Sequence, residues 1–153
     1  MTLFTVFAAK YLIYVVALGG ALAVGWGVHR GRRELLWIVA IALPLGYALA
    51  RLAGLFYSHY QPFAEQGFEP LIPHAIDNSF PSDHTVIAGI FSTVAFLADR
   101  RAGLVLWAMT LLVGAGRVAA GLHWPIDILA SCALALLAVI AAHYLQASVQ
   151  GRQ

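Results

Sequence analysis

The chain has very few charged residues. Of its 153 residues only 10% are charged and 61% are hydrophobic, whereas soluble domains average about 25% charged and about 45–50% apolar residues. A soluble fold of this length has too much surface to hide so many apolar side chains. Intrinsic disorder is also excluded, because it requires low hydrophobicity and high net charge. We therefore expect lipid to be the main solvent of this protein.

Signals for metals, nucleotides and nucleic acids are missing as well. The single cysteine, Cys132, lies in an apolar run and has no second thiol with which to form an intramolecular disulfide. The sequence has neither the Cys/His spacing of zinc sites nor a glycine-rich nucleotide loop. Its nine basic and seven acidic residues nearly cancel, and no basic patch points to nucleic acid as a partner. We expect no metal and no other cofactor.

The apolar segments predict an all-α polytopic membrane bundle of about five transmembrane helices, forming a single domain over residues 1–153. A membrane-spanning helix needs about 20 mainly apolar residues. The predicted spans are 11–28, 35–57, 84–98, 102–120 and 125–147. Segment 58–80 contains three prolines and many polar residues, so it is predicted to be an extramembrane loop. If residues 1–28 do not cross the membrane, four spans remain.

Basic residues predict the orientation of these helices, because they accumulate in cytoplasmic loops. The ends that follow the first, third and fifth spans carry Arg30, Arg32, Arg33, Arg100, Arg101 and Arg152. If all five spans cross the membrane, these three ends lie on the same side of it, which we interpret as the cytoplasmic side. The loop 58–80 and the junction 121–124 then lie on the outer side. That side receives His59, His74, His84 and His123.

The third span opens with Phe80-Pro81-Ser82-Asp83-His84. Ser82 and Asp83 suit the start of a helix, so a purely structural cap is one interpretation. A helix start also binds anions through its free N–H groups, with Ser82 as a further donor and His84 as a proton donor to a leaving oxygen. Asp83 would repel a phosphate unless it were paired, so we expect Arg117 or Arg51 as its partner.

Residues 116–127 join the fourth and fifth spans. Pro125 suits the first helical position, which places His123 just before the helix and Asp127 at about its third position. Asp127 can bond back to the helix start, as in a capping box. Alternatively it bonds one imidazole nitrogen of His123 and leaves the other free to attack. Arg117 favours a functional interpretation, because an ionisable residue in a span is costly and a guanidinium matches phosphate oxygens.

Other polar residues fall near the same outer end. Arg51 lies one or two turns inside the second span, where its side chain either extends to the interface or contacts a phosphate. The run 59–63 can supply further polar contacts. We expect His74, Asp77, Asn78 and Ser79 to order the loop rather than react. This set of residues favours phosphoryl transfer through a phosphohistidine over acyl transfer, which would leave the arginines without a role.

Two of these segments resemble the signature motifs of a known family. The segment 80–84 and the pattern R-x5-H-x3-D over 117–127 resemble the second and third motifs of the type-2 phosphatidic acid phosphatase superfamily. Within that superfamily, the chain is similar to the BcrC/YbjG-type undecaprenyl-diphosphate phosphatases. This similarity lies in the S-D-H sequence of residues 82–84, in the preceding segment 73–79 and in segment 123–127. The similarity runs from about residue 9 to about residue 147.

The resemblance implies a role for each matching residue. His123 would be the nucleophile, Asp127 its orienting partner and His84 the acid that protonates the leaving group, while Arg117 and Ser82 would hold the phosphate. The implied reaction is metal-independent hydrolysis of a lipid-linked polyprenyl diphosphate to the monophosphate and inorganic phosphate. The implied location is the outer face of a bacterial inner membrane.

The first family motif, K-x6-R-P, is degenerate here. Gly54 stands at the lysine position and Gln61 at the arginine position, and Gly116 replaces the usual serine before Arg117. We expect Arg51 or a protonated His59 to supply the missing cation, with Gln61 as a neutral donor. Two alternatives stay open. The chain is a phosphatase of another lipid phosphate, or it is a degenerate member that binds or transports lipid phosphates with little or no hydrolysis.

Overall fold

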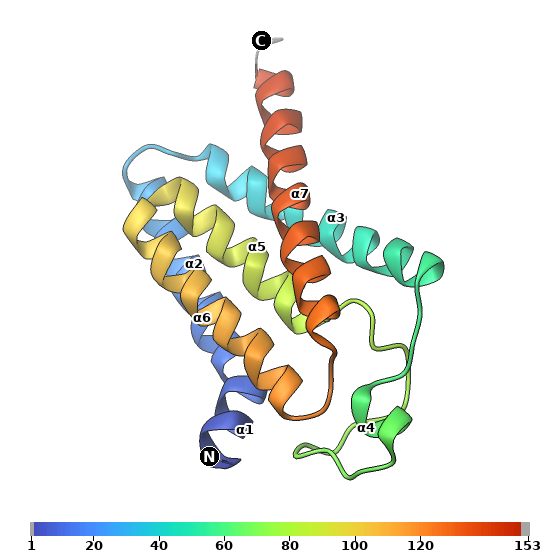
Figure 1. Cartoon of the computed structure of the whole chain (residues 1–153). Helices are drawn as coiled ribbons and strands as arrows, with labels where there is room; N and C mark the ends of the chain where they lie inside the picture. The colour runs from blue at the N-terminus through green and yellow to red at the C-terminus, as the bar shows by residue number, and fades with distance from the viewer. Residues whose placement is uncertain (1, 151–153) are drawn as a thin grey trace.

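A computed structural model describes residues 2–150, and all its long elements are helices. Figure 1 shows their arrangement. The helices are α1 (Thr2–Lys10), α2 (Leu12–His29), α3 (Glu34–Phe56), α4 (Pro62–Gln66), α5 (Asp83–Ala98), α6 (Arg100–Ala119) and α7 (Pro125–Gln150). The predicted all-α bundle is therefore confirmed.

The five predicted spans correspond to α2, α3, α5, α6 and α7. Four of them, α2, α3, α6 and α7, are long and apolar enough to cross a membrane. Helix α5 has 16 residues and is about 24 Å long at 1.5 Å per residue. The segment before the first span forms the separate helix α1, which ends just before Tyr11.

Helix α5 lies at the centre of the bundle and packs against α2, α3, α6 and α7. Val86, Ile90 and Val94 of α5 join the main hydrophobic core, together with Leu35 and Ile38 of α3. Large apolar side chains also cover the outside of the bundle, among them Leu18, Leu22, Leu55, Leu129 and Leu137. Such a surface suits a protein whose helices face lipid.

The two ends of the bundle differ in chemistry. The α2–α3 and α5–α6 connections and the end of α7 lie toward one end of the molecule (Figure 1). Five of the six arginines that we assigned to the cytoplasm lie there, and Arg152 falls outside the described residues. Helix α1, helix α4 and the α6–α7 junction lie toward the opposite end.

The segment 57–82 folds across the ends of α5, α6 and α7. Its path is held by backbone hydrogen bonds, from Phe63 N to Gly121 O at 3.1 Å and from Ser79 N to His59 O at 2.9 Å. Gly121 has φ = 77°, a conformation that favours glycine. A Cβ atom there would also lie 2.6 Å from the ring of Phe68. This segment brings side chains from the loop onto the α6–α7 junction.

Candidate active site

His123 has a defined tautomer. Its Nδ1 atom lies 2.8 Å from the carbonyl oxygen of Ser79, and its Nε2 atom lies 3.1 Å from Nη2 of Arg117. A carbonyl only accepts hydrogen bonds and a guanidinium only donates them. The proton of the neutral ring is therefore on Nδ1, and Nε2 carries the lone pair. The arrangement directs a nucleophilic nitrogen toward a cation.

Arg117 is a buried cation with a free donor. The residue is only 5% exposed, and its Nε atom has no hydrogen-bond partner. A buried, unsatisfied donor on a charged group is costly and requires an explanation. A phosphate would provide one, because two donors of the guanidinium fork can bond two of its oxygens. Arg117 thus has one buried donor without a protein partner close to His123.

Asp127 is fully buried and accepts several hydrogen bonds. Its Oδ2 atom accepts from Ser79 Oγ at 2.6 Å and from Trp124 N at 2.9 Å. Nδ1 of His123 lies 3.4 Å from the same oxygen, which is longer than its 2.8 Å contact with the Ser79 carbonyl. The Nδ1 atom of His123 thus contacts Ser79 as well as Asp127, whereas we expected Asp127 alone. The contact with Trp124 N is the capping interaction, so both sequence interpretations of Asp127 coexist.

Ser79 is the residue that sequence reasoning missed. We expected it to order the loop, yet it contacts both His123 and Asp127. It lies 44 residues from His123 in the chain, at the end of the segment 73–79 and outside the segments 80–84 and 117–127 to which we assigned chemical roles. No spacing signal in the sequence relates it to either partner.

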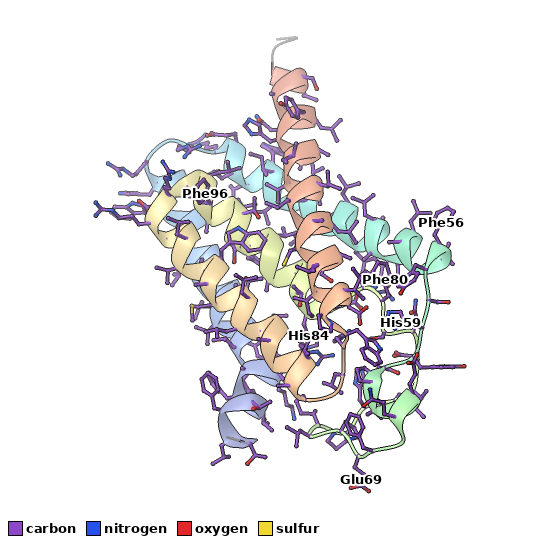
Figure 2. All side chains as sticks on the ribbon, in the orientation of Figure 1. Phe56, His59, Glu69, Phe80, His84 and Phe96 are labelled. Carbon is purple, nitrogen blue, oxygen red and sulfur yellow. The ribbon has the colours of Figure 1, made fainter. Side chains whose placement is uncertain are left out.

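The start of α5 supplies two further side chains. Ser82 is buried, and its backbone N–H and carbonyl both bond Ser131 Oγ, at 2.9 and 3.1 Å. Its own hydroxyl oxygen accepts from Thr85 at 3.2 Å, which leaves the Ser82 O–H available to donate. His84 is half-buried on the first turn of α5 (Figure 2). It lies within electrostatic range of Arg117 and His123.

Asp83 has the basic partner that we expected, but the pairing changes the role of Arg51. The two side chains form an ion pair in which each is about half exposed. The Arg51 guanidinium also lies 5.1 Å from the centre of the Tyr47 ring. Its charge is therefore already compensated by protein. The structure does not place Arg51 or Asp83 as a free ligand for phosphate.

Gln61 and His59 are occupied by protein partners too. Gln61 is 1% exposed, and its amide donates to Ala75 O at 3.2 Å and to the Asp77 carboxylate. Its Oε1 atom accepts from Asp77 N at 3.2 Å. Gln61 therefore orders the loop rather than facing the site. The Nε2 atom of His59 lies 2.9 Å from Asp127 Oδ1, so that nitrogen is not free for phosphate either.

Gly54 and Gly116, the two glycines that depart from the family pattern, are closely surrounded by other protein atoms. A Cβ atom at Gly54 would lie 3.1 Å from both Asn78 Nδ2 and Phe80 O. At Gly116 it would lie 2.8 Å from the backbone nitrogen of Ala9. Helix α1 therefore occupies the space that a serine side chain would need at position 116.

His74 lies in the loop near the same residues. Partial desolvation of its ring, together with the positive charge of Arg117, lowers the pKa of His74 below its ordinary value. The proximity of His123 adds to the effect. His74 thus belongs to the electrostatic surroundings of Arg117, although it makes none of the contacts that define the tautomer of His123.

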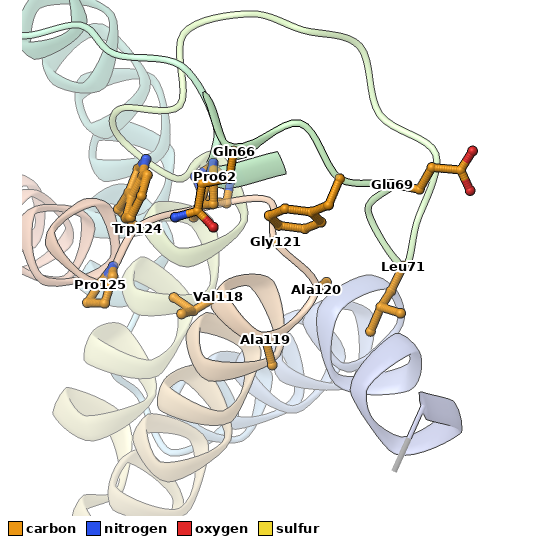
Figure 3. Close-up of a pocket in the computed structure, with 12 residues that line it drawn as sticks. Pro62, Gln66, Glu69, Leu71, Val118, Ala119, Ala120, Gly121, Trp124 and Pro125 are labelled. Carbon is orange, nitrogen blue, oxygen red and sulfur yellow. The ribbon is translucent and has the colours of Figure 1, made fainter. Parts of the chain in front are cut away.

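A pocket of about 460 Å³ lies beside His123, between α4, the end of α6 and the start of α7. Figure 3 shows the residues that line it, with the carboxylate of Glu69 directed away from the pocket. The volume falls within the range typical of small-molecule sites. Within residues 2–150, no three His, Cys, Asp or Glu side chains gather closely enough to hold a metal ion.

The chain matches the model of a known protein family, and individual relatives, over most of its length. The model of the PAP2 superfamily matches residues 35–150. The bacitracin transport permease protein BcrC of Bacillus licheniformis is 36% identical, over 88% of this chain and 66% of that protein. The undecaprenyl-diphosphatase BcrC of Bacillus subtilis is 36% identical, over 86% of this chain and 68% of that protein. The chain thus spans about two thirds of the length of these relatives.

Comparison with solved structures supports the fold. The crystal structure of Aquifex aeolicus LpxE superposes with a TM-score of 0.67 at 21% identity. The superposition covers 92% of this chain and 81% of that one. At this level of identity the likeness concerns the arrangement of the helices.

Proposed function

The chain belongs to the PAP2 superfamily, and from this membership we propose that it is an integral-membrane lipid diphosphate phosphatase. The proposed reaction converts undecaprenyl diphosphate to undecaprenyl phosphate and inorganic phosphate. The observation that carries the proposal is the tautomer of His123, whose Nε2 lone pair faces Arg117 at 3.1 Å. The name of the Bacillus subtilis relative supports the choice of substrate.

In the first proposed step, Nε2 of His123 attacks the terminal phosphorus. An N–P bond forms while the bond from phosphorus to the bridging oxygen breaks, and His84 gives its proton to that oxygen. Arg117 turns from Nε2 to the phosphoryl oxygens and compensates their charge. The imidazole gains positive charge during attack, which the Ser79 carbonyl and the Asp127 carboxylate stabilise.

In the second step, water attacks the phosphohistidine. His84, now neutral, takes a proton from that water, the N–P bond breaks and inorganic phosphate leaves. His123 returns to its starting tautomer because Nδ1 has kept its proton on the Ser79 carbonyl. No metal enters either step, so we expect the reaction to proceed without one.

The membrane setting supports a lipid-linked substrate. Helix α5, at about 24 Å, is shorter than the hydrocarbon core of about 30 Å. We infer that Ser82 and His84 at its start lie near one membrane interface, within reach of a lipid headgroup. Because the arginine-rich connections lie at the opposite end, we assign the site to the periplasmic or exterior face of a bacterial inner membrane.

One observation favours the alternative function of binding without hydrolysis. Arg51 and His59, which we expected to supply the missing cation, are bonded to other protein groups. So is Gln61, the expected neutral donor. Arg117 is the one buried Lys or Arg side chain among the described residues. With fewer cations around the phosphate, a member of this family can bind or transport a lipid phosphate while turning it over slowly, or can prefer a lipid other than undecaprenyl diphosphate.

A panel of substrates tests these proposals. Phosphate release is measured with the detergent-purified chain on undecaprenyl diphosphate, phosphatidic acid and phosphatidylglycerol phosphate, with and without EDTA. We expect the highest rate on undecaprenyl diphosphate, no effect of EDTA, and a loss of at least about a thousandfold in His123→Ala. The exposed His143, at the other end of α7, provides the control variant His143→Ala.

The outcomes separate the hypotheses. Activity that persists in His123→Ala contradicts the proposed nucleophile, and loss of activity in EDTA contradicts metal independence. Binding of lipid phosphate without turnover supports the alternative function. A higher rate on phosphatidic acid or phosphatidylglycerol phosphate reassigns the substrate.

A further inference from the structure

His59 completes the hydrogen bonding of a buried carboxylate. Ser79 and Trp124 both donate to Oδ2 of Asp127, whereas His59 Nε2 contacts Oδ1 at 2.9 Å. An ionised carboxylate only accepts hydrogen bonds, so His59 carries a proton on Nε2 and donates it. Because Asp127 is fully buried, an oxygen left without a donor there would be costly.

The backbone holds His59 beside Ser79. Tyr60 and Asn78 form an isolated antiparallel bridge, and Ser79 N donates to His59 O at 2.9 Å. The side chains of His59 and Ser79 both end on Asp127, and the carbonyl of Ser79 accepts from His123. These four residues form a closed set of contacts around the nucleophile.

Aromatic rings limit the movement of His59. Its ring lies 5.1 Å from the ring of Tyr57 and 6.4 Å from those of Phe80 and Trp124, measured between centres. The Trp124 indole N–H donates to Tyr60 O at 3.0 Å, which fixes that ring in turn. The His59 side chain is 17% exposed. Figure 2 shows its place near the start of α7.

We propose that His59 is a positioning residue for the phosphoryl-transfer step, acting through Asp127, and is not a phosphate ligand. By donating to Oδ1 it holds the carboxylate so that Oδ2 faces Ser79, Trp124 N and the Nδ1 edge of His123. The proposal rests on the phosphatase function proposed above. It assigns a task to a histidine outside the segments that matched the second and third family motifs.

Two amide substitutions test the inference as a matched pair. A glutamine amide nitrogen is as many bonds from Cα as the His59 Nε2 atom, whereas the asparagine amide nitrogen is one bond closer. Both amides are neutral donors of similar polarity. His59→Gln can therefore keep the bond to Asp127, and His59→Asn falls short of it. His59→Ala removes the donor entirely.

The expected result is a split between kcat and KM for phosphate release from undecaprenyl diphosphate. We expect kcat to fall between about tenfold and a hundredfold in His59→Asn and His59→Ala, as for other small misplacements of a reacting group. KM should stay within about twofold in both, and His59→Gln should keep kcat within about threefold of the unsubstituted chain. If His59→Ala does not fold, the Gln and Asn variants decide.

Two outcomes overturn the inference. One is a kcat in His59→Asn equal to that of His59→Gln. The other is a rise of KM with unchanged kcat in His59→Asn, which would make His59 a phosphate ligand. Either outcome can be measured only if the unsubstituted chain is active. If that chain releases no phosphate from any lipid of the panel, the proposed phosphatase function is wrong. The positioning role of His59 is then rejected because it depends on that function.

Discussion

Arg117 donates a hydrogen bond to the Nε2 atom of His123, at a distance of 3.1 Å. The arginine thereby occupies the lone pair that would attack a phosphate. A substrate phosphate can displace this contact because it offers the guanidinium two charged oxygens in place of one neutral nitrogen. Binding of the substrate and release of the nucleophile would then be the same event.

Arg117→Ala should reduce kcat/KM for phosphate release by at least about a hundredfold, in the range reported for removal of one oxyanion donor. Arg117→Lys should recover only part of the loss, because an ammonium lacks the planar fork that bonds two oxygens. Steady-state assays on undecaprenyl diphosphate measure both. Arg101→Ala, at the exposed opposite end of α6, serves as the control. Full activity in Arg117→Lys would show that charge alone is needed.

Asp127→Asn should leave the tautomer of His123 unchanged. The Nδ1 proton is held chiefly by the Ser79 carbonyl at 2.8 Å, and this backbone acceptor survives the substitution. We therefore expect kcat to fall by less than the roughly 10⁴-fold that accompanies a wrong tautomer in a serine protease triad. Imidazole ¹⁵N chemical shifts of His123 report the tautomer. A proton found on Nε2 in the variant would contradict this assignment.

Gln61→Arg should raise the rate by less than about threefold, although it restores the family motif at that position. The Gln61 side chain is buried against the Asp77 carboxylate, so we expect a guanidinium there to pair with Asp77 rather than with substrate. Phosphate release by the two purified chains is compared at equal concentration. A gain of more than about tenfold would mean that the missing charge limits the rate.

Gly116→Ser should destabilise the protein, although it too restores a family residue. A Cβ atom at this position would lie 2.8 Å from the backbone nitrogen of Ala9, and overpacking of this kind costs about 1–3 kcal/mol. Thermal unfolding in detergent should therefore occur at a lower temperature. Gly25→Ser is the matched control, because no atom lies within 4 Å of a Cβ atom there. Equal unfolding temperatures for both variants would show that α1 can shift to accommodate the serine side chain without a loss of stability.

The sequence by itself determined the membrane bundle and the end at which the reactive residues gather. Apolar runs of about 20 residues must be helical in lipid, where no water satisfies the backbone, so hydropathy located the spans to within a few residues. The arginines of the short connections marked one end. The order and spacing of the two motifs singled out His84, Arg117, His123 and Asp127.

Only the tertiary structure decided which group bonds which. The path of the loop 57–82 places Ser79 and His59 on Asp127, pairs Arg51 with Asp83 and buries Gln61 against Asp77. These contacts join residues separated by 16 to 68 positions. Spacing along a helix predicts neighbours within about one turn, but it carries no information on where a long loop crosses the end of a bundle. The hydrogen-bond partners of His123 and Asp127 therefore follow from the fold rather than from the motifs.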